Sequence, residues 1–529
     1  MSQTPNLPAS IFNDVIGPVM RGPSSSHVAG AARIAEIVRR SLGGDVAKVA
    51  VDFDVNGSLA ESHDGHGTDM GFAAGILGLD IADPAAPDAE RLARERGVEI
   101  AFHVCDYGAE HPNNYRIAAE GRDGRSHTWE AVSVGGGMIE MRRYDGFEVS
   151  IAGGYHEVLV TLRPSGETAA EAARHIEALF PDRASSSLSS HADRALLSLQ
   201  CEAAPPPATL RAIAALPAVR DVAYIRPILP TASRAACRVP FTDAAGLLAA
   251  AGPDAPQMWR LAARYESARG GESEEAVFER MRGLCRIMRR AVDDGLAGTR
   301  YRDRILGPQA HLIASAAAAG RLLPCEVLND VIRYVTAIME VKSAMGVVVA
   351  APTAGSCGCL PGTVLAVADA LGMPEERAVE GLLCAGLVGV FFAEAATFAA
   401  EVAGCQVECG AGSGMAAAAV AQMLGGTVRQ CLDAAAMALQ NVTGLACDPV
   451  ANRVEVPCLG KNVMGASNAL AAANMALAGF DAVVPLDQVI SAIYDIGTKL
   501  PLELRCTFGG LGKTAASLEI RKKLEHRNM

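Results

Sequence analysis

Residues 404–423 read GCQVECGAGSGMAAAAVAQM, a glycine- and cysteine-rich loop that runs directly into a series of small apolar side chains. Alanine has the highest helix propensity, and small side chains let neighbouring helices approach closely. Similar Ala- and Gly-rich helical patterns, broken by short loops, continue through residues 256–529. We therefore predict an all-α C-terminal domain over 256–529.

The preceding sequence predicts two further domains. Residues 1–155 combine alternating strand patterns, helical spacing and an Asp145-Gly146 pair between two alternating runs, which is a strong hairpin signal. Residues 156–230 follow the order βαββαβ, which is typical of a ferredoxin-like fold. The expected class is a multidomain α+β protein, with an N-terminal α/β domain, a ferredoxin-fold middle domain, a proline-containing linker over 228–255 and the helical domain.

Composition limits the possible partners. The 529 residues carry a net charge of −12, which argues against wholesale binding to nucleic acid or to anionic membranes. The first residues lack the basic and apolar regions of a signal peptide. The most hydrophobic window, 382–400, contains Glu394 and is more typical of a buried helix than of a membrane span. We expect a soluble, cytoplasmic protein.

The segment RGPSSSHVAG, residues 21–30, places three serines and a histidine together before a helical pattern. Serine hydroxyls, backbone N–H groups and a helix N-terminus form a pocket for a carboxylate or a phosphate. The alternative is simple capping of the helix by Ser25 or Ser26. One cap needs one serine, so we favour an anion site that contains Ser24, Ser25, Ser26 and His27.

Two further polar loops are candidates for chemistry. GHGTD offers a histidine beside an aspartate, a pair that can transfer protons, although a turn with local caps has the same composition. APTAGSCGCLPG has backbone and hydroxyl donors ahead of a helix and is a second candidate nest for a carboxylate, unless it is an ordinary helix connection. The residues concerned are His66, Thr68, Asp69, Thr353 and Gly355.

The chain has fourteen cysteines, which are scattered rather than framed as in a disulfide scaffold. Most are expected to be buried core thiols. Cys405, Cys409, Cys447 and Cys458 instead lie on polar loops. A structural zinc site needs four ligands, whereas an iron–sulfur cluster held by three thiolates leaves one iron open. The spacing alone leaves both alternatives open.

These motifs together resemble the bacterial iron–sulfur-dependent L-serine dehydratases over nearly the whole chain. IGPVMRGPSSSHVAGAARIA, GHGTD followed by GILG, and SVGGGMIEM are similar to the β part of that family. AAPTAGSCGCLPG, GCQVECGAGSGMAAAA and GLACDPVANRVEVPC are similar to the α part. Many relatives have the two parts as separate subunits, and here they are fused.

The resemblance implies a [4Fe–4S] cluster held by Cys405, Cys447 and Cys458, with Cys357 and Cys409 as neighbours. It implies removal of water from L-serine, giving pyruvate and ammonia, with an open iron as Lewis acid. It also implies an ACT-like middle domain, and we expect a homodimer. Pyridoxal phosphate is not expected, because no Schiff-base lysine context is evident.

The resemblance also assigns roles at the site. We expect His66 to be the general base, with His27 and Lys461 as rivals. The residues expected to bind the substrate are Ser24, Ser25, Ser26, His27, Thr68, Asp69, Thr353, Gly355 and Asn462.

Several features depart from the family pattern. Val28 stands where threonine is common, and Lys461-Asn462 where Arg-Asn is common. The chain ends in EHRNM, without the terminal cysteine of some single-chain relatives, and TLRPSGE lacks the usual turn of the middle domain. The alternatives are a related lyase for threonine or cysteine, and an amino-acid sensor with a relic active site.

Overall fold

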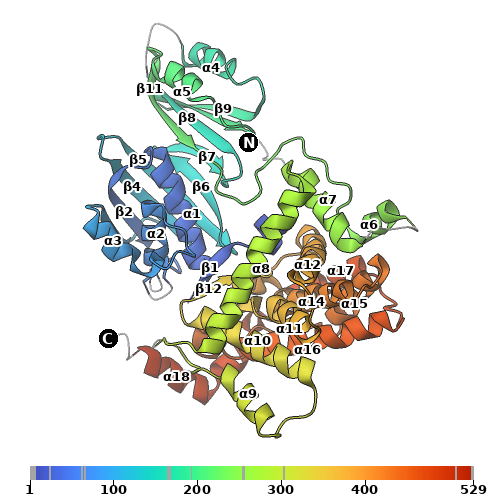
Figure 1. The fold of residues 1–529 in the computed structure, drawn as a ribbon. Helices are drawn as coiled ribbons and strands as arrows, with labels where there is room; N and C mark the ends of the chain where they lie inside the picture. The colour runs from blue at the N-terminus through green and yellow to red at the C-terminus, as the bar shows by residue number, and fades with distance from the viewer. Residues whose placement is uncertain are drawn as a thin grey trace. The chain divides into compact units, whose positions relative to one another are not determined.

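The structure is a computed structural model of a mixed α+β protein (Figure 1). It describes residues 7–22, 25–60, 63–64, 67–163, 168–191, 194–252, 257–301, 304–506 and 509–525, without the side chains of Ser25, Ser26 and Glu525. The chain forms two compact units. One contains residues 24–237, and the other contains residues 8–23 together with 238–529.

The first unit contains a six-stranded sheet with the order β3-β2-β4-β5-β6-β7. β2 and β3 are parallel and the other neighbours are antiparallel. Val49, Val51 and Phe53 on β2 are fully buried in the core shared with α1 and α2. The strands and helices are β2 (Val46–Asp54), β3 (Glu99–Cys105), β4 (Asn114–Gly121), β5 (Ser126–Gly135), β6 (Met138–Tyr144), β7 (Phe147–Ile151), α1 (Ser25–Ser41), α2 (Thr68–Leu77) and α3 (Ala89–Glu95).

Two local predictions in this unit have clear outcomes. The Asp145-Gly146 hairpin is confirmed, since both residues have positive φ between β6 and β7, as a two-residue hairpin turn requires. The prediction that Ser25 or Ser26 caps the following helix is wrong, because α1 begins at Ser25 and both serines lie in its first turn. A cap residue precedes the helix and has non-helical backbone angles.

The rest of this unit has the predicted βαββαβ order. A four-stranded antiparallel sheet has the order β11-β8-β10-β9, as in ferredoxin-like folds. Apolar side chains of β8 and β10 pack against α4 and α5 on one face. That this region is ACT-like stays a prediction. Its elements are β8 (His156–Leu162), α4 (Ala169–Glu177), β9 (Arg183–His191), β10 (Arg194–Cys201), α5 (Pro207–Ala214) and β11 (Val219–Ile225).

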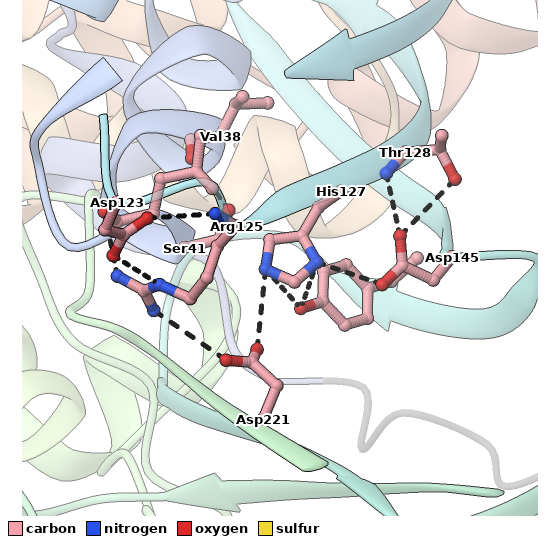
Figure 2. A network of polar contacts seen from close by, with 10 residues as sticks. Val38, Ser41, Asp123, Arg125, His127, Thr128, Asp145 and Asp221 are labelled. Carbon is pink, nitrogen blue, oxygen red and sulfur yellow. Dashed lines mark hydrogen bonds and ion pairs between the residues drawn. The ribbon is translucent and has the colours of Figure 1, made fainter. Parts of the chain in front are cut away.

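A buried histidine joins the two sheets of this unit (Figure 2). His127 on β5 lies with Nδ1 2.9 Å from Asp145 Oδ2 and Nε2 3.4 Å from Asp221 Oδ2 on β11. The Tyr144 hydroxyl is 2.9 Å from the same Nδ1. A cavity of about 690 Å³ lies beside this network and is lined by none of the predicted site residues.

The second unit is mainly helical, as predicted for its C-terminal part. Its helices are α6 (Ala244–Ala251), α7 (Met258–Gly270), α8 (Glu274–Ala297), α9 (Ala310–Ala318), α10 (Glu326–Ser343), α11 (Cys359–Ala370), α12 (Glu375–Ala395), α13 (Ala400–Ala403), α14 (Cys409–Met423), α15 (Val428–Gln440), α16 (Cys458–Leu477), α17 (Leu486–Thr498) and α18 (Ala515–Glu525).

Helix α14, the small-residue stretch of 409–423, lies at the centre of this unit (Figure 1). Every residue of α14 is buried, and the helix packs against α12, α15 and α16. A Cβ atom on Gly414 would lie 2.9 Å from Cγ of Leu439 on α15. The small side chains therefore permit the close helix packing that the sequence predicts.

Helix α12 contains most of the hydrophobic window. It is long and apolar enough to cross a membrane, but 78% of its most apolar window is buried inside the protein. It packs against α7, α8 and α14. The predicted buried helix is confirmed.

Residues 8–23 pack with the helical unit although they directly precede residues 24–237 of the first unit in the sequence. β1 (Val19–Arg21) pairs antiparallel with β12 (Val347–Val349), and a short π-helix, η1 (Ile11–Val15), packs on α12. The predicted domain boundaries at 155, 156–230 and 256 stay predictions.

Candidate active site

Loops of the helical unit bring five cysteines together. Cys405, Cys409 and Cys447 are buried in one cluster, and the partly exposed Cys506 packs against it. Cys409 and Cys447 lie close enough to Cys405 to shift its pKa, and Cys506 lies close enough to shift that of Cys447. Cys458, on the first turn of α16, is buried and close enough to feel the charge of Cys405. The predicted cysteines of the three loops therefore face a common region.

Cys405 is the cysteine of this group whose environment favours the thiolate form. Hydrogen bonds from Cys409 and Cys447, aided by the charge of Lys461, hold the pKa of Cys405 well below its usual range despite burial. Burial raises the pKa of Cys458 to about 12. A thiolate, not a thiol, binds a metal, so a bound cation would have to deprotonate the other thiols.

The arrangement of the donor side chains distinguishes between the two metal sites that the sequence leaves open. In the part of the chain that the structure describes, no three Cys, His, Asp or Glu side chains are arranged to hold a single metal ion. A cluster differs from an ion because its thiolates bind different iron atoms. A buried set of sulfur donors from separate loops therefore fits an iron–sulfur cluster better than a closed zinc site.

Asn462 holds two of these loops in place. Its side-chain amide donates hydrogen bonds to the carbonyls of Gly355 and Cys458, both at 2.8 Å. Its oxygen accepts hydrogen bonds from the backbone N–H groups of Gly358 and Cys359, at 3.2 and 2.9 Å. The polar atoms of Asn462 are thus engaged by the protein itself, at a fully buried position.

The side chain of Lys461 is also bound by groups of the protein itself. Its Nζ donates to the carbonyl of Ala446 at 2.6 Å and pairs with Asp448 Oδ1 at 2.8 Å. Burial acts to lower the pKa of Lys461, but the bond to Asp448 and the Cys405 charge outweigh it and raise that pKa. Lys461 is therefore a cation that balances thiolate charge.

A carboxylate from another loop of the protein binds to the Thr353 loop. The Thr353 hydroxyl donates a hydrogen bond to Glu408 Oε2, and Glu408 lies between Cys405 and Cys409 in the sequence. Burial, reinforced by the charge of Cys405, raises the pKa of the Glu408 carboxyl well above its usual range. The loop that we predicted as a nest for a substrate carboxylate already binds an acidic side chain.

The predicted residues of the first unit are partly described. His66, Ser24 and the side chains of Ser25 and Ser26 lie outside the described residues, and His27 lies in the first turn of α1. Thr68 and Asp69 begin α2 and are buried. Asp69 pairs with His63, whose Nδ1 lies 2.8 Å from each carboxylate oxygen. Burial raises the pKa of Asp69 to about 6, although His63 opposes the shift.

Sequence reasoning missed three residues of these sites. Glu408 is the one charged residue in the quoted stretch 404–423 and could have been noticed for that reason. Cys506 has no short-spaced partner in the sequence, and only the fold brings it to Cys447, whose carbonyl accepts its N–H at 2.9 Å. His63 precedes the GHGTD motif and carries no separate signal.

Two family models match parts of this chain. The family model described as serine dehydratase alpha chain matches residues 253–511, and that described as serine dehydratase beta chain matches residues 14–97. The probable L-serine dehydratase alpha chain of Bacillus subtilis (strain 168) is 42% identical over 254 residues, which are 48% of this chain and 85% of that protein.

Two further relatives extend the match. The probable L-serine dehydratase beta chain of Bacillus subtilis (strain 168) is 40% identical over 151 residues, 28% of this chain and 67% of that protein. The L-serine dehydratase alpha chain of Peptoniphilus asaccharolyticus is 39% identical over 207 residues, 39% of this chain and 71% of that protein. The chain belongs to the serine dehydratase family, and it joins regions similar to the beta and alpha chains in one polypeptide.

Proposed function

We propose that this protein is an L-serine ammonia-lyase that removes water from L-serine to give pyruvate and ammonia. Family membership supports the reaction. The observation that carries the mechanism is the convergence of buried thiols from separate loops. We propose that Cys405, Cys447 and Cys458 hold a [4Fe–4S] cluster.

When the cluster is bound, an iron atom without a protein thiolate supplies a Lewis acid for the departing hydroxyl group. The chain's residues supply the rest. Lys461 keeps a positive charge next to the thiolates, and Asn462 fixes the loops that carry Gly355 and Cys458. Positioning of this kind lowers the barrier by fixing the geometry of the reacting groups.

A base must remove the Cα proton of serine. Lys461 is poorly suited, because its pKa is raised and a protonated amine accepts no proton. We therefore retain His66 as the base, with His27 as its rival. We propose that the serines at 24–26, with Thr68 and Asp69, contribute to binding the charged end of the substrate.

Three further features that we expect from the sequence are part of this proposal. The βαββαβ region is proposed to be ACT-like, the active form a homodimer and the place of action the cytoplasm. The strand order of the four-stranded sheet supports the first of these. Light scattering of the purified enzyme tests the second.

The deciding experiment is anaerobic purification followed by assays for pyruvate and for bound iron and sulfide. We expect turnover of L-serine far above that of D-serine, and loss of iron and activity in air. Single Ser variants of Cys405, Cys447 and Cys458 should each lose the cluster. Variants of Cys384 and Cys431, which are buried in α12 and α15, are matched controls and should retain it.

Two outcomes would count against the proposal. A full cluster in Cys447→Ser together with its loss in Cys409→Ser would reject the ligand assignment. A wild-type protein that contains zinc or no metal, and dehydrates serine regardless of air, would reject the mechanism.

A further inference from the structure

The Glu408 carboxylate has an unusual environment. The Thr353 hydroxyl donates to its Oε2 atom, and a Cβ on Gly355 would lie 2.8 Å from that atom. The strongest charge effects on its pKa come from Cys405, Cys506 and Glu401, and all three raise it. The carboxylate therefore lies among hydroxyl, backbone and acidic groups.

Among the residues that the structure describes, no lysine, arginine or histidine forms an ion pair with Glu408. Lys461, the lysine of the neighbouring loop, is already paired with Asp448. A desolvated carboxylate without a cation is costly, so the site favours a positively charged ligand group.

Glu408 is not fully enclosed by the protein. The residue is partly exposed, whereas its neighbours Cys405 and Cys409 are buried. One carboxylate oxygen packs closely against Gly355. A substrate carboxylate would be repelled here, so of the two charged groups on an α-amino acid only the ammonium group suits this position.

We propose that Glu408 binds the ammonium group of the substrate and that Thr353 orients its carboxylate for that contact. The inference rests on the proposed function, and it assigns the substrate's amine to the Thr353 loop. The substrate class is a small amino acid with a free primary ammonium group.

The test compares two competitive inhibitors of the anaerobically prepared holoenzyme. L-alanine and L-lactate lack the leaving hydroxyl group and differ from each other only in ammonium versus hydroxyl. We expect the wild type to bind L-alanine more tightly. In Glu408→Gln this preference should fall by about tenfold or more, as expected when a charge-assisted contact is lost. Iron and sulfide content, measured in parallel, should be unchanged.

Control variants make the result specific. Glu401→Gln removes an exposed acidic side chain from the same segment and should leave the preference unchanged. If Glu408→Gln loses the cluster, Thr353→Val is used instead and should reduce the preference. An unchanged alanine-to-lactate ratio in a cluster-loaded Glu408→Gln or Thr353→Val enzyme that still dehydrates serine overturns this inference. A wild type that does not dehydrate serine overturns the proposed function instead.

Discussion

At the scale of single residues, the side chain of Asn462 connects the loops of the candidate site. It makes five hydrogen bonds, three as donor, including one to the Cys409 sulfur at 3.6 Å, and two as acceptor, and it is fully buried. Asn462→Ala leaves these backbone groups without partners, which should lower the free energy of unfolding by at least about 2 kcal/mol. Chemical denaturation of the anaerobic protein measures this change.

The matched control for this prediction lies on the same helix. Asn474 on α16 is exposed, and Asn474→Ala should change the free energy of unfolding by less than about 0.5 kcal/mol. Equal effects of the two substitutions would mean that helix propensity, and not the loop contacts, determines the loss at Asn462.

Glu157 on β8 predicts a pH dependence of stability. It is 1% exposed, and burial raises its pKa to about 8, although a hydrogen bond from Gln200 opposes the shift. The folded state then binds more protons than the unfolded state between about pH 4.5 and about pH 8. The free energy of unfolding should therefore fall as the pH rises through this interval, by about 3–5 kcal/mol in total.

Glu157→Gln removes the titrating group and should flatten this part of the pH profile. Glu148→Gln changes an exposed carboxylate on β7 and should leave the profile as in the wild type. Thermal unfolding of the three proteins at several pH values measures the difference. A wild-type profile that rises from pH 5 to pH 8 with the same slope in Glu157→Gln would contradict the prediction.

The chemistry of the site was predictable where it rests on loop composition. Cysteines beside Gly, Asp and Pro at 405, 447 and 458 are poor core residues, and the structure gathers their loops. The contacts of Glu408 and Cys506 depend on tertiary structure, because their partners are 55 and 59 residues away in the sequence. Local pattern carries no information about such pairs.

At the scale of elements, His127 joins β5 to β11. Its imidazole lies between Asp145 and Asp221, with the Tyr144 hydroxyl at 2.9 Å (Figure 2). His127→Leu keeps a similar volume but removes the polar contacts of the imidazole with these three groups, which should cost about 1–3 kcal/mol. Urea unfolding of the full chain in a Trp259→Phe background, followed by the fluorescence of Trp129 in the same core, measures the loss.

His103 provides the control for the His127 substitution. It also lies beside an aspartate, Asp52, at 3.3 Å, but its side chain is 55% exposed. His103→Leu should therefore change the stability by only about 0.5 kcal/mol or less. A loss at His103 as large as that at His127 would show that the buried network is not the stabilising feature.

The order of elements was more predictable than their pairing. The alternating strands and amphipathic helices of 156–230 predict βαββαβ, because each element carries its own period. The pairing of β1 with β12 joins residues 19–21 to 347–349 and has no local signal. The same limit applies to the parallel pairing of β2 with β3 across the helices between them.

At the scale of the whole molecule, the beginning of the chain belongs to the fold of its C-terminal half. The backbone N–H of Ile11 donates to Glu266 Oε2 at 2.8 Å, and the Tyr265 hydroxyl donates to the carbonyl of Ala9 at 2.8 Å. The apolar side chains of this segment are almost completely buried: Ile11, Phe12, Val15, Ile16 and Met20. Residues 8–23 therefore complete the core of the helical unit.

Ile11 allows the contribution of residues 8–23 to the core of the helical unit to be tested. Ile11 is fully buried, and a Cβ on Gly386 of α12 would lie 2.6 Å from Ile11 Cγ2, so the two surfaces are closely packed. Ile11→Ala should lower the free energy of unfolding of the helical unit by about 2–5 kcal/mol, since the substitution removes buried methyl groups and leaves a cavity.

Hydrogen exchange measured by mass spectrometry separates the two units, and protection should fall in α12 and α7 but not in β4 or β5. Leu371→Ala, at a half-exposed position of the same unit, should change protection little. Loss of protection confined to 8–23, with α12 unaffected, would mean that the segment is an appendage of the helical unit and not part of its core.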